Sequence, residues 1–445
     1  MEPQNDLFNL YFRLHADTEP PVIYHRWSLL TCLSAYLGRQ CWMPFGTGRV
    51  FPNFYTMLIG HPGARKSTAI KLGKKLFSAA GYSTYAAEKT SKEKFLLDLE
   101  GLTEDDIADA MPKRGRNFKT KHGMTHEELT DALFGKETRN DAALKTAKEV
   151  FIVADEFNEF VGSGNLEFLS LLGMLWDWDD EAQDYQFRLK NSKSVSIYQP
   201  TISILSGNTH AGFVEAFPPQ AIGQGFLSRI ILVYGEPSGK KIPFPTIPSD
   251  EAKAEVVARL HEIKKKVIGP ITHDKEAHHA FGIIYNTWKD LEDGRFKHYS
   301  SRRYTHLLKL SMLVAATRCS TEITVGDVVY ANTILSWTET DMPKALGEFG
   351  KSRDSDVASK IMTALYETNR PLAASDLLKI VKNDLDKSTQ LVDIMMRLQN
   401  SGQIQLIQGQ GYLPKQKTVD SKQLYVKYDL LREWQAKNGG LRLVK

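Results

Sequence analysis

The 445-residue chain has few cysteines and no extended hydrophobic run. Its three cysteines, Cys32, Cys41 and Cys319, lie far apart and form no CxxC pair. This spacing argues against a zinc site and a disulfide framework, and it suits a reducing cytoplasm. Because no run of about 18 apolar residues is present, we expect no membrane span and no membrane partner. The first residues, MEPQNDLFNLYF, do not resemble a secretory signal.

A strong charge of either sign is also absent. The net charge is +4, but residues 351–445 hold 16 lysines and arginines against 10 acidic residues. This basic C-terminal segment fits a nucleic-acid partner, and it fits a solvated surface equally well. The composition, 42% hydrophobic and 25% charged, is that of a globular protein, and the length predicts two or three domains.

A strand, a glycine-rich turn and a helix follow one another early in the chain. Residues 51–60 (FPNFYTMLIG) predict a strand that ends in glycine, and residues 69–81 predict a helix. Between them, residues 60–68 (GHPGARKST) fit the phosphate-binding pattern G-x-x-x-x-G-K-[ST], except that Arg65 replaces the second glycine. The expected fold class is therefore α/β with a P-loop NTPase core.

The turn is the predicted site for ATP and Mg²⁺. Its backbone N–H groups and the N-terminus of the next helix would hold the phosphates. Lys66 would contact the β- and γ-phosphates, and the Ser67 hydroxyl would bind Mg²⁺. A chance glycine-rich turn is the alternative, which the flanking strand and helix disfavour. The residues assigned to the nucleotide are Gly60, Pro62, Gly63, Ala64, Arg65, Lys66, Ser67 and Thr68.

Acidic and amide side chains follow two later apolar segments. EVFIVA (149–154) ends at Asp155 and Glu156, and ISILSGN ends at Asn208. Asp155 would orient Mg²⁺ through water, and Glu156 would act as the general base on the attacking water. Asn208 would hold that water or contact the γ-phosphate. A solvated acid pair and a turn asparagine are the alternatives.

Two arginines are further candidates. Arg229, in GFLSRI, precedes another apolar strand, and a guanidinium there suits charge that develops on the γ-phosphate of a neighbouring subunit. Arg303 opens a helix beside Arg302 and could contact the phosphates as a second sensor. A surface arginine and a solvated helix end are the respective alternatives.

Residues 186–198 alternate in polarity around Asn191 and Ser192, which predicts a β-hairpin. The hairpin carries Arg188, Lys190 and Lys193, which would grip a DNA backbone independently of sequence. An ordinary exposed hairpin is the alternative. Residues 110–148 are polar and charged and predict an insertion.

Four domains are expected along the chain. The last has three short helices followed by a hairpin, the pattern of a winged helix. In its helix 387–399, four apolar residues serve packing and few basic side chains point outward, so DNA contact by this domain is left open. The four residues are Leu391, Ile394, Met395 and Leu398. The domains are a helical N-terminal segment (1–50), an ATPase core (51–245), an α-helical lid (246–350) and the winged helix (351–445).

The order of these motifs resembles the AAA+ core of the minichromosome maintenance helicases. Those helicases also lack the second phosphate-loop glycine, insert a hairpin before the sensor strand and carry a Ser-Arg finger, here Ser228-Arg229. The chain is also similar to a phage and prophage helicase-like ATPase family of unassigned domain function. That similarity rests on Pro52-Asn53-Phe54-Tyr55 and the following loop, and the resemblance covers about residues 20–340.

The resemblance implies a hexameric, ATP-dependent replicative DNA helicase of a phage or mobile element. The expected location is the cytoplasm, which is that of the bacterial host if a phage encodes the protein. Lys66, Ser67, Asp155, Glu156 and Asn208 would act in one subunit and Arg229 in its neighbour. Single-stranded or forked DNA would be the track, and a separate primase, polymerase or loader could be a partner. Two alternatives stay open: an ATP-driven motor for packaging, transposition or defence, and an ATP-switched initiator or loader that assembles on DNA.

Overall fold

The computed structural model describes residues 6–101, 147–179, 184–188, 194–217, 225–347, 353–368, 370–382, 385, 388–400 and 403–414. These residues divide into two compact units. The larger unit lies within Glu2–Glu292 and Phe296–Ala345, and the smaller one within Leu346–Lys445 together with Asp293–Arg295. The insertion expected at 110–148 lies outside the described residues, apart from its last two positions.

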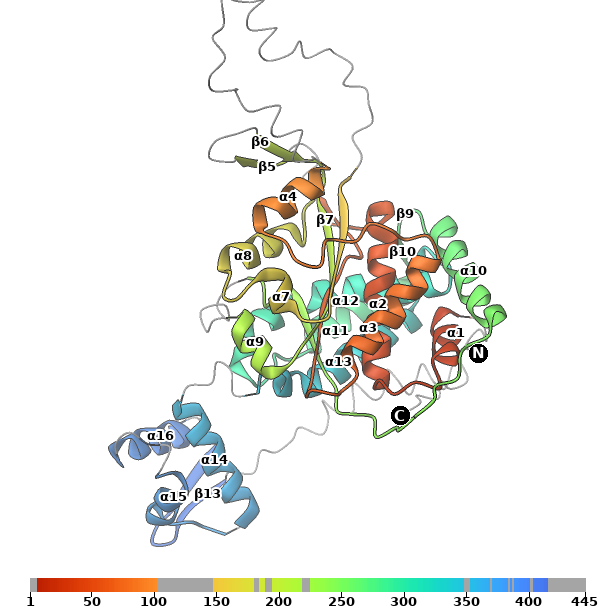
Figure 1. Cartoon of the computed structure of the whole chain (residues 1–445). Helices are drawn as coiled ribbons and strands as arrows, with labels where there is room; N and C mark the ends of the chain where they lie inside the picture. Colours follow the sequence, from red (N-terminus) through yellow and green to blue (C-terminus); the bar gives the residue numbers. More distant parts are fainter. Residues whose placement is uncertain are drawn as a thin grey trace, which may run out of the picture. The chain divides into compact units, whose positions relative to one another are not determined.

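The larger unit is built around a parallel sheet of four strands (Figure 1). The strands are β3 (Tyr55–Ile59), β4 (Glu149–Ala154), β7 (Thr201–Asn208) and β8 (Ile230–Tyr234), in the order β4-β7-β3-β8. Every residue of β3, β7 and β8 is buried, as expected when helices cover both faces of a parallel sheet. The chain is therefore a mixed α/β protein with a parallel sheet.

Next to β4, the chain adds a single bridge to the sheet. Tyr85 pairs in parallel with Phe151 of β4, and the Phe151 N–H donates to the Thr84 carbonyl at 2.9 Å. A helix, α4 (Lys92–Glu100), follows and is capped by the Ser91 side chain. This bridge extends the outer edge of the sheet beyond β4.

Helices cover the two faces of the sheet. On one side lie α2 (Val22–Leu37) and α3 (Lys66–Ala79), which pack on each other, and on the other lie α7, α8 and α9 (Figure 1). Almost every residue of α2 is buried, so this N-terminal helix belongs to the core of the unit. The bounds of the other three helices are Phe157–Val161, Leu166–Leu175 and His210–Ala216.

The N-terminal region is not helical throughout. After α1 (Leu7–Leu14), α2 and a short 3-10 turn, residues 41–50 form an antiparallel hairpin of β1 (Cys41–Phe45) and β2 (Gly48–Val50). Gly46 at its turn has a φ of 60°, a conformation that glycine adopts without strain. The helical expectation for residues 1–50 is therefore wrong at its C-terminal end.

The region expected as a lid contains four helices and three short strands, and one of these strands joins it to the N-terminal hairpin. β9 (Gly269–Pro270) pairs with β1, and β10 (Thr272–His273) pairs with β11 (Glu322–Ile323). The lid region is thus not purely α-helical, and it lies in the same compact unit as the sheet. The helices are α10 (Asp250–Lys266), α11 (Lys275–Thr287), α12 (Lys297–Thr317) and α13 (Val325–Leu346).

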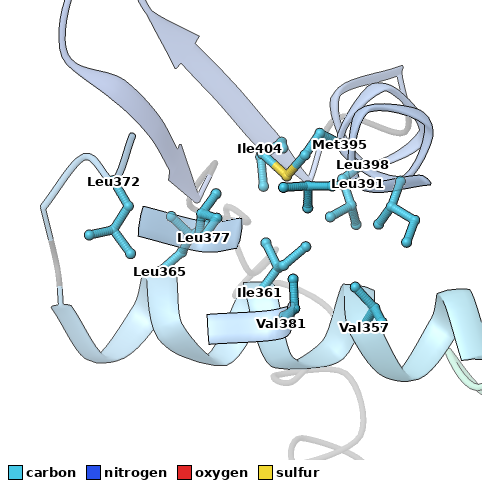
Figure 2. Close-up of a cluster of buried hydrophobic side chains, with 11 residues drawn as sticks. Val357, Ile361, Leu365, Leu372, Leu377, Val381, Leu391, Met395, Leu398 and Ile404 are labelled. Carbon is cyan, nitrogen blue, oxygen red and sulfur yellow. The ribbon is translucent and has the colours of Figure 1, made fainter. Parts of the chain in front are cut away.

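The smaller unit has its own hydrophobic core (Figure 2). Three helices, α14 (Arg353–Thr368), α15 (Ala374–Val381) and α16 (Ser388–Asn400), precede an antiparallel hairpin of β12 (Ile404–Ile407) and β13 (Gly411–Pro414). The four packing residues expected in α16 all belong to this core, which confirms that part of the prediction. They are Leu391, Ile394, Met395 and Leu398.

Within the described part of the chain, no helix combines the length and the apolar character needed to cross a bilayer.

Candidate functional site

The carboxyl ends of the parallel strands meet at one edge of the sheet. Gly60 follows β3, Asp155 follows β4 and Asn208 is the last residue of β7. The register pairs Ile59 with Asn208, so the loop after β3 and the amide at the end of β7 lie level with each other. Ligands of open α/β sheets bind outside this edge, which makes it the candidate site.

A helix of the N-terminal region holds the start of the loop. The Tyr24 hydroxyl of α2 donates to the carbonyls of Ile59 (2.8 Å) and Gly235 (2.9 Å), at the ends of β3 and β8. A Cβ on Gly60 would lie 2.4 Å from that hydroxyl oxygen. Gly60 is therefore required by the close approach of Tyr24, and the two residues together fix where the loop leaves the sheet.

Lys66 points its ammonium group at the loop carbonyls. It is the first residue of α3, and its Nζ donates to the carbonyl oxygens of Gly60 (2.8 Å) and His61 (3.0 Å). Burial lowers the pKa of Lys66, and the nearby Glu156 carboxylate opposes that shift. A phosphate oxygen would offer this cation a full negative charge in place of neutral carbonyls.

Arg65 adopts the left-handed conformation directly before α3. Its φ is 63° and its ψ 25°, and its side chain gives no capping hydrogen bond to the helix. The guanidinium lies against Glu19, with 2.5 Å between Arg65 Nε and Glu19 Oε2. The first turn of α3 thus begins without a side-chain cap, which leaves a helix N-terminus suited to an anion.

The other loop residues line the same turn. Gly63 has a φ of 83°, and the N–H of the buried Ala64 donates to the His61 carbonyl at 3.1 Å. Pro62 is exposed, while Ser67 is half-buried and Thr68 is exposed in the first turn of α3. Ser67 is thus partly accessible at the start of α3.

The acid pair lies at the end of β4 in two different environments. The half-buried Asp155 carboxylate accepts from the Lys71 ammonium of α3 at 2.8 Å. Glu156 is exposed, precedes α7 as its N-cap and acts electrostatically on Lys66. Glu156 is thus near Lys66, as the general-base role requires. Asp155 instead forms an ion pair with Lys71, a residue that the sequence did not indicate.

Asn208 is fully buried between the loop and the acid pair. The Thr209 N–H donates to its Oδ1 at 3.0 Å, and its Nδ2 has no hydrogen-bond partner among the described residues. The preceding Gly207 allows close contact, because a Cβ there would lie 2.5 Å from the Asp155 carbonyl oxygen. A buried amide N–H without a partner costs free energy, and a phosphate or water oxygen would satisfy it.

Arg229 lies at the opposite edge of the sheet. It precedes β8, whose first residue pairs with Tyr55 at the start of β3, and its Nη1 donates to the Gly225 carbonyl at 2.5 Å. Burial lowers the pKa of Arg229, and the neighbouring Arg302 lowers it further. Since β3 spans about 13 Å between its terminal Cα atoms, Arg229 does not reach the loop of its own chain.

Arg303 belongs to the packing of the helical region, which corrects the second-sensor assignment. Its side chain is 2% exposed, and its Nε donates to Glu339 Oε1 at 2.6 Å. Its Nη2 donates to Asn332 Oδ1 at 2.8 Å, and its guanidinium lies 4.7 Å from the Trp288 ring centroid. The charge is neutralised inside α12 and α13, so Arg303 is not presented to a phosphate.

The hairpin expected between the acid strand and the Asn208 strand is present. β5 (Tyr185–Arg188) pairs antiparallel with β6 (Ser194–Ile197), with Arg188 opposite Ser194. Lys190 and Lys193 lie outside the described residues, as does the side chain of Arg188.

Sequence reasoning missed three residues that shape the site: Glu19, Tyr24 and Lys71. Lys71 lies on α3 four positions after Ser67, so a helical projection could have placed these two residues on one face. No sequence signal points to Glu19 or Tyr24, because their partners are far away along the chain.

The donor chemistry at this edge fits Mg²⁺. Ser67 and Asp155 supply a hydroxyl and a carboxylate, the hard oxygen donors that Mg²⁺ prefers together with phosphate and water. Among the described residues, no group of three or more histidine, cysteine or acidic side chains forms a metal cage.

Comparison with models of protein families and with curated proteins finds no match for the chain.

Proposed function

We propose that the protein is a P-loop ATPase of the AAA+ class. The observation that carries this proposal is the convergence of Lys66, Glu156 and the unpartnered Asn208 amide at the carboxyl edge of one parallel sheet. The strand order supports it, because β7 separates the loop strand from the acid strand. On this proposal Asn208 lies between the phosphate site and the base, where the attacking water would lie.

Each residue then has a distinct task. Lys66 binds the β- and γ-phosphates, and the first turn of α3 offers N–H groups to them. Glu156 accepts a proton from the attacking water, and the Asn208 Nδ2 orients that water. Bound through Ser67 and, by way of water, Asp155, Mg²⁺ would neutralise charge on the phosphate oxygens.

The ATPase works as a ring of subunits in this proposal, and a hexamer is the state we expect. Support comes from Arg229, which lies across the sheet from its own loop. An arginine finger there acts on the nucleotide of the adjacent copy. Head-to-tail contacts of this kind close into a ring when the rotation between copies allows it.

DNA is the proposed substrate of this ATPase, and strand separation by a helicase is its proposed activity. Support comes from the β5–β6 hairpin between the acid strand and the Asn208 strand, where nucleotide state could move it. The smaller unit has the helix order and hairpin of a winged helix. Val392 and Met396 are exposed on α16, so we assign DNA contact to the β5–β6 hairpin in preference to α16.

One observation favours an ATP-switched initiator or loader as the second candidate. The Lys71 ammonium holds the Asp155 carboxylate at 2.8 Å, and an acid so engaged is less available to Mg²⁺. A switch that binds ATP without turning it over would tolerate this pair. The Lys71→Ala substitution separates the candidates: faster turnover in this variant favours the switch, and unchanged turnover favours the motor.

The decisive experiment measures ATP turnover of the full chain with and without single-stranded DNA, and unwinding of a forked duplex. The proposal predicts turnover that DNA stimulates, that Glu156→Gln abolishes without preventing ATP binding, and that accompanies unwinding. Turnover indifferent to DNA would point to a motor with another client, such as packaging, transposition or defence. ATP binding with no turnover would contradict the ATPase proposal.

A further inference from the structure

Arg65 stands where the phosphate-loop pattern has glycine, yet its backbone is left-handed. A φ of 63° is strained for a residue with a Cβ, and such strain persists only when surrounding contacts hold it. The conformation matters, because a left-handed residue next to right-handed ones turns successive N–H groups toward one side and forms an anion-binding concavity. The contact that holds Arg65 is therefore part of the proposed ATP site.

Glu19 supplies that contact. Its Oε2 lies 2.5 Å from Arg65 Nε, and its Oε1 accepts from the Ile242 N–H at 2.9 Å. The Ile242 N–H, and after it Arg65, hold the pKa of Glu19 below its usual range, so the carboxylate is ionised. Arg65 itself is about half exposed and reaches toward Glu19, so its side chain serves the loop conformation.

The same carboxylate ties the loop to a segment far along the chain. Ile242 belongs to residues 236–249, which follow β8 and run to α10. The Ser238 hydroxyl also donates to the Glu19 carbonyl at 2.5 Å. Glu19 thus joins three pieces of chain: the phosphate loop, the stretch before α2 and the segment after β8.

We propose that Glu19 is a positioning residue for ATP binding, which holds Arg65 left-handed and so keeps the loop N–H groups in their phosphate-binding arrangement. The role rests on the proposed ATP site. It concerns binding, because Glu19 acts through Arg65 and touches no group assigned to the chemical step. Glycine at position 65 would adopt the same backbone without help.

The chain offers a matched control in Asp17. The Asp17 carboxylate accepts from the Thr246 N–H at 2.7 Å, so it pins the same segment that Glu19 pins. Its electrostatic partner is Lys240, which also lies on that segment. Removing Asp17 loosens the segment without removing the partner of Arg65.

The test compares four full-length variants: Glu19→Ala, Asp17→Ala, Arg65→Gly and the Glu19→Ala/Arg65→Gly double variant. Binding of a fluorescent ATP analogue gives the Kd, and steady-state turnover gives kcat and KM. We expect Glu19→Ala to raise the Kd and KM about tenfold with little change in kcat, because the strained residue is released. Asp17→Ala should stay within about twofold of wild type. The double variant should bind like Arg65→Gly alone.

The double variant also distinguishes positioning from general destabilisation. A Glu19→Ala protein that is merely less stable would stay defective when Arg65 is glycine, and that result would overturn the proposal. An unchanged Kd in Glu19→Ala would overturn it as well, while leaving the ATPase proposal intact. Failure of the wild-type protein to bind the analogue would overturn both.

Discussion

The polar side chains at the two edges of the parallel sheet differ in the charge of the groups that they contact. At the carboxyl edge, Lys66 is held by neutral carbonyls, and the buried Asn208 Nδ2 lacks a partner among the described residues. At the amino edge, Lys309 is fully buried, 3.4 Å from the Asp177 carboxylate and 2.7 Å from Asn53 Oδ1. Arg229 lies near that same aspartate.

The difference fits the proposal that the carboxyl edge binds a phosphate and that the amino edge presents a cation to a second copy. At the carboxyl edge, Lys66 and the Asn208 amide have no anionic hydrogen-bond partner in the part of the chain that the structure describes. This is the state expected of a phosphate site before the phosphate binds. The amino edge gathers Arg229, Arg302 and Lys309 around Asp177. A single chain keeps these edges a strand length apart, so in the proposed ring Arg229 would meet the nucleotide of a second copy.

The largest effect should come from removing the cation of the carboxyl edge. Lys66→Ala should lower ATP turnover by at least about a hundredfold, because no fixed charge would then meet the transferred phosphate. Turnover and analogue binding measure the loss. Lys75→Ala, an exposed lysine on the same helix, is the control and should behave like wild type. Equal activity in the two variants would remove Lys66 from the site.

A smaller loss is expected from the unpartnered amide. Asn208→Ala should reduce kcat about tenfold to a hundredfold and leave the Kd for the ATP analogue nearly unchanged, because the amide orients water in the proposed reaction. The pattern to look for is the split between kcat and Kd. A parallel loss of binding would assign Asn208 to phosphate contact, and no loss in either would return it to a structural role.

Arg303 should affect stability and leave nucleotide binding alone. Arg303→Met leaves the buried Glu339 carboxylate without its cationic partner. This loss should lower the free energy of unfolding by about 3–5 kcal/mol. Denaturant unfolding measures this cost. The double variant Arg303→Met/Glu339→Gln should recover much of it, since the glutamine still accepts from the Tyr299 hydroxyl. An increase in the Kd for ATP in a folded variant would restore the sensor assignment.

A buried histidine at the amino edge should make stability depend on pH. Burial lowers the pKa of His306 from 6.5 to about 3, and its Nε2 lies 3.2 Å from the Ser228 carbonyl oxygen. Below pH 6.5, His306 binds a proton in the unfolded chain but stays neutral in the folded chain. The free energy of unfolding should therefore decrease as the pH falls from 6.5 to about 3. His306→Gln should shrink that dependence by about 1.4 kcal/mol per pH unit. An unchanged slope would contradict a neutral buried His306.

Much of the carboxyl edge could be predicted from sequence, because its parts are local. The strand, turn and helix around Lys66 and the apolar run before Asp155 each carry their own pattern, and the structure brings them to one edge. The hairpin at 186–198 and the packing face of α16 follow from alternation and helical spacing for the same reason.

The contacts that fix the loop could not be predicted in this way. Tyr24 and Glu19 act on residues at least 35 positions away, and nothing in a local pattern specifies such a pairing. Arg303 resembled a phosphate ligand because a helix start suggests exposure, yet Glu339, one helix later, buries and neutralises it.

The most direct test of the central claim mixes two inactive proteins. Lys66→Ala keeps the amino-edge arginine, and Arg229→Ala keeps the phosphate loop, so a mixed assembly contains interfaces at which both are intact. If the site is shared between copies, the mixture should recover ATP turnover that neither variant shows alone. Full activity of Arg229→Ala by itself, or no recovery in assemblies shown to contain both variants, would contradict a site built from two copies.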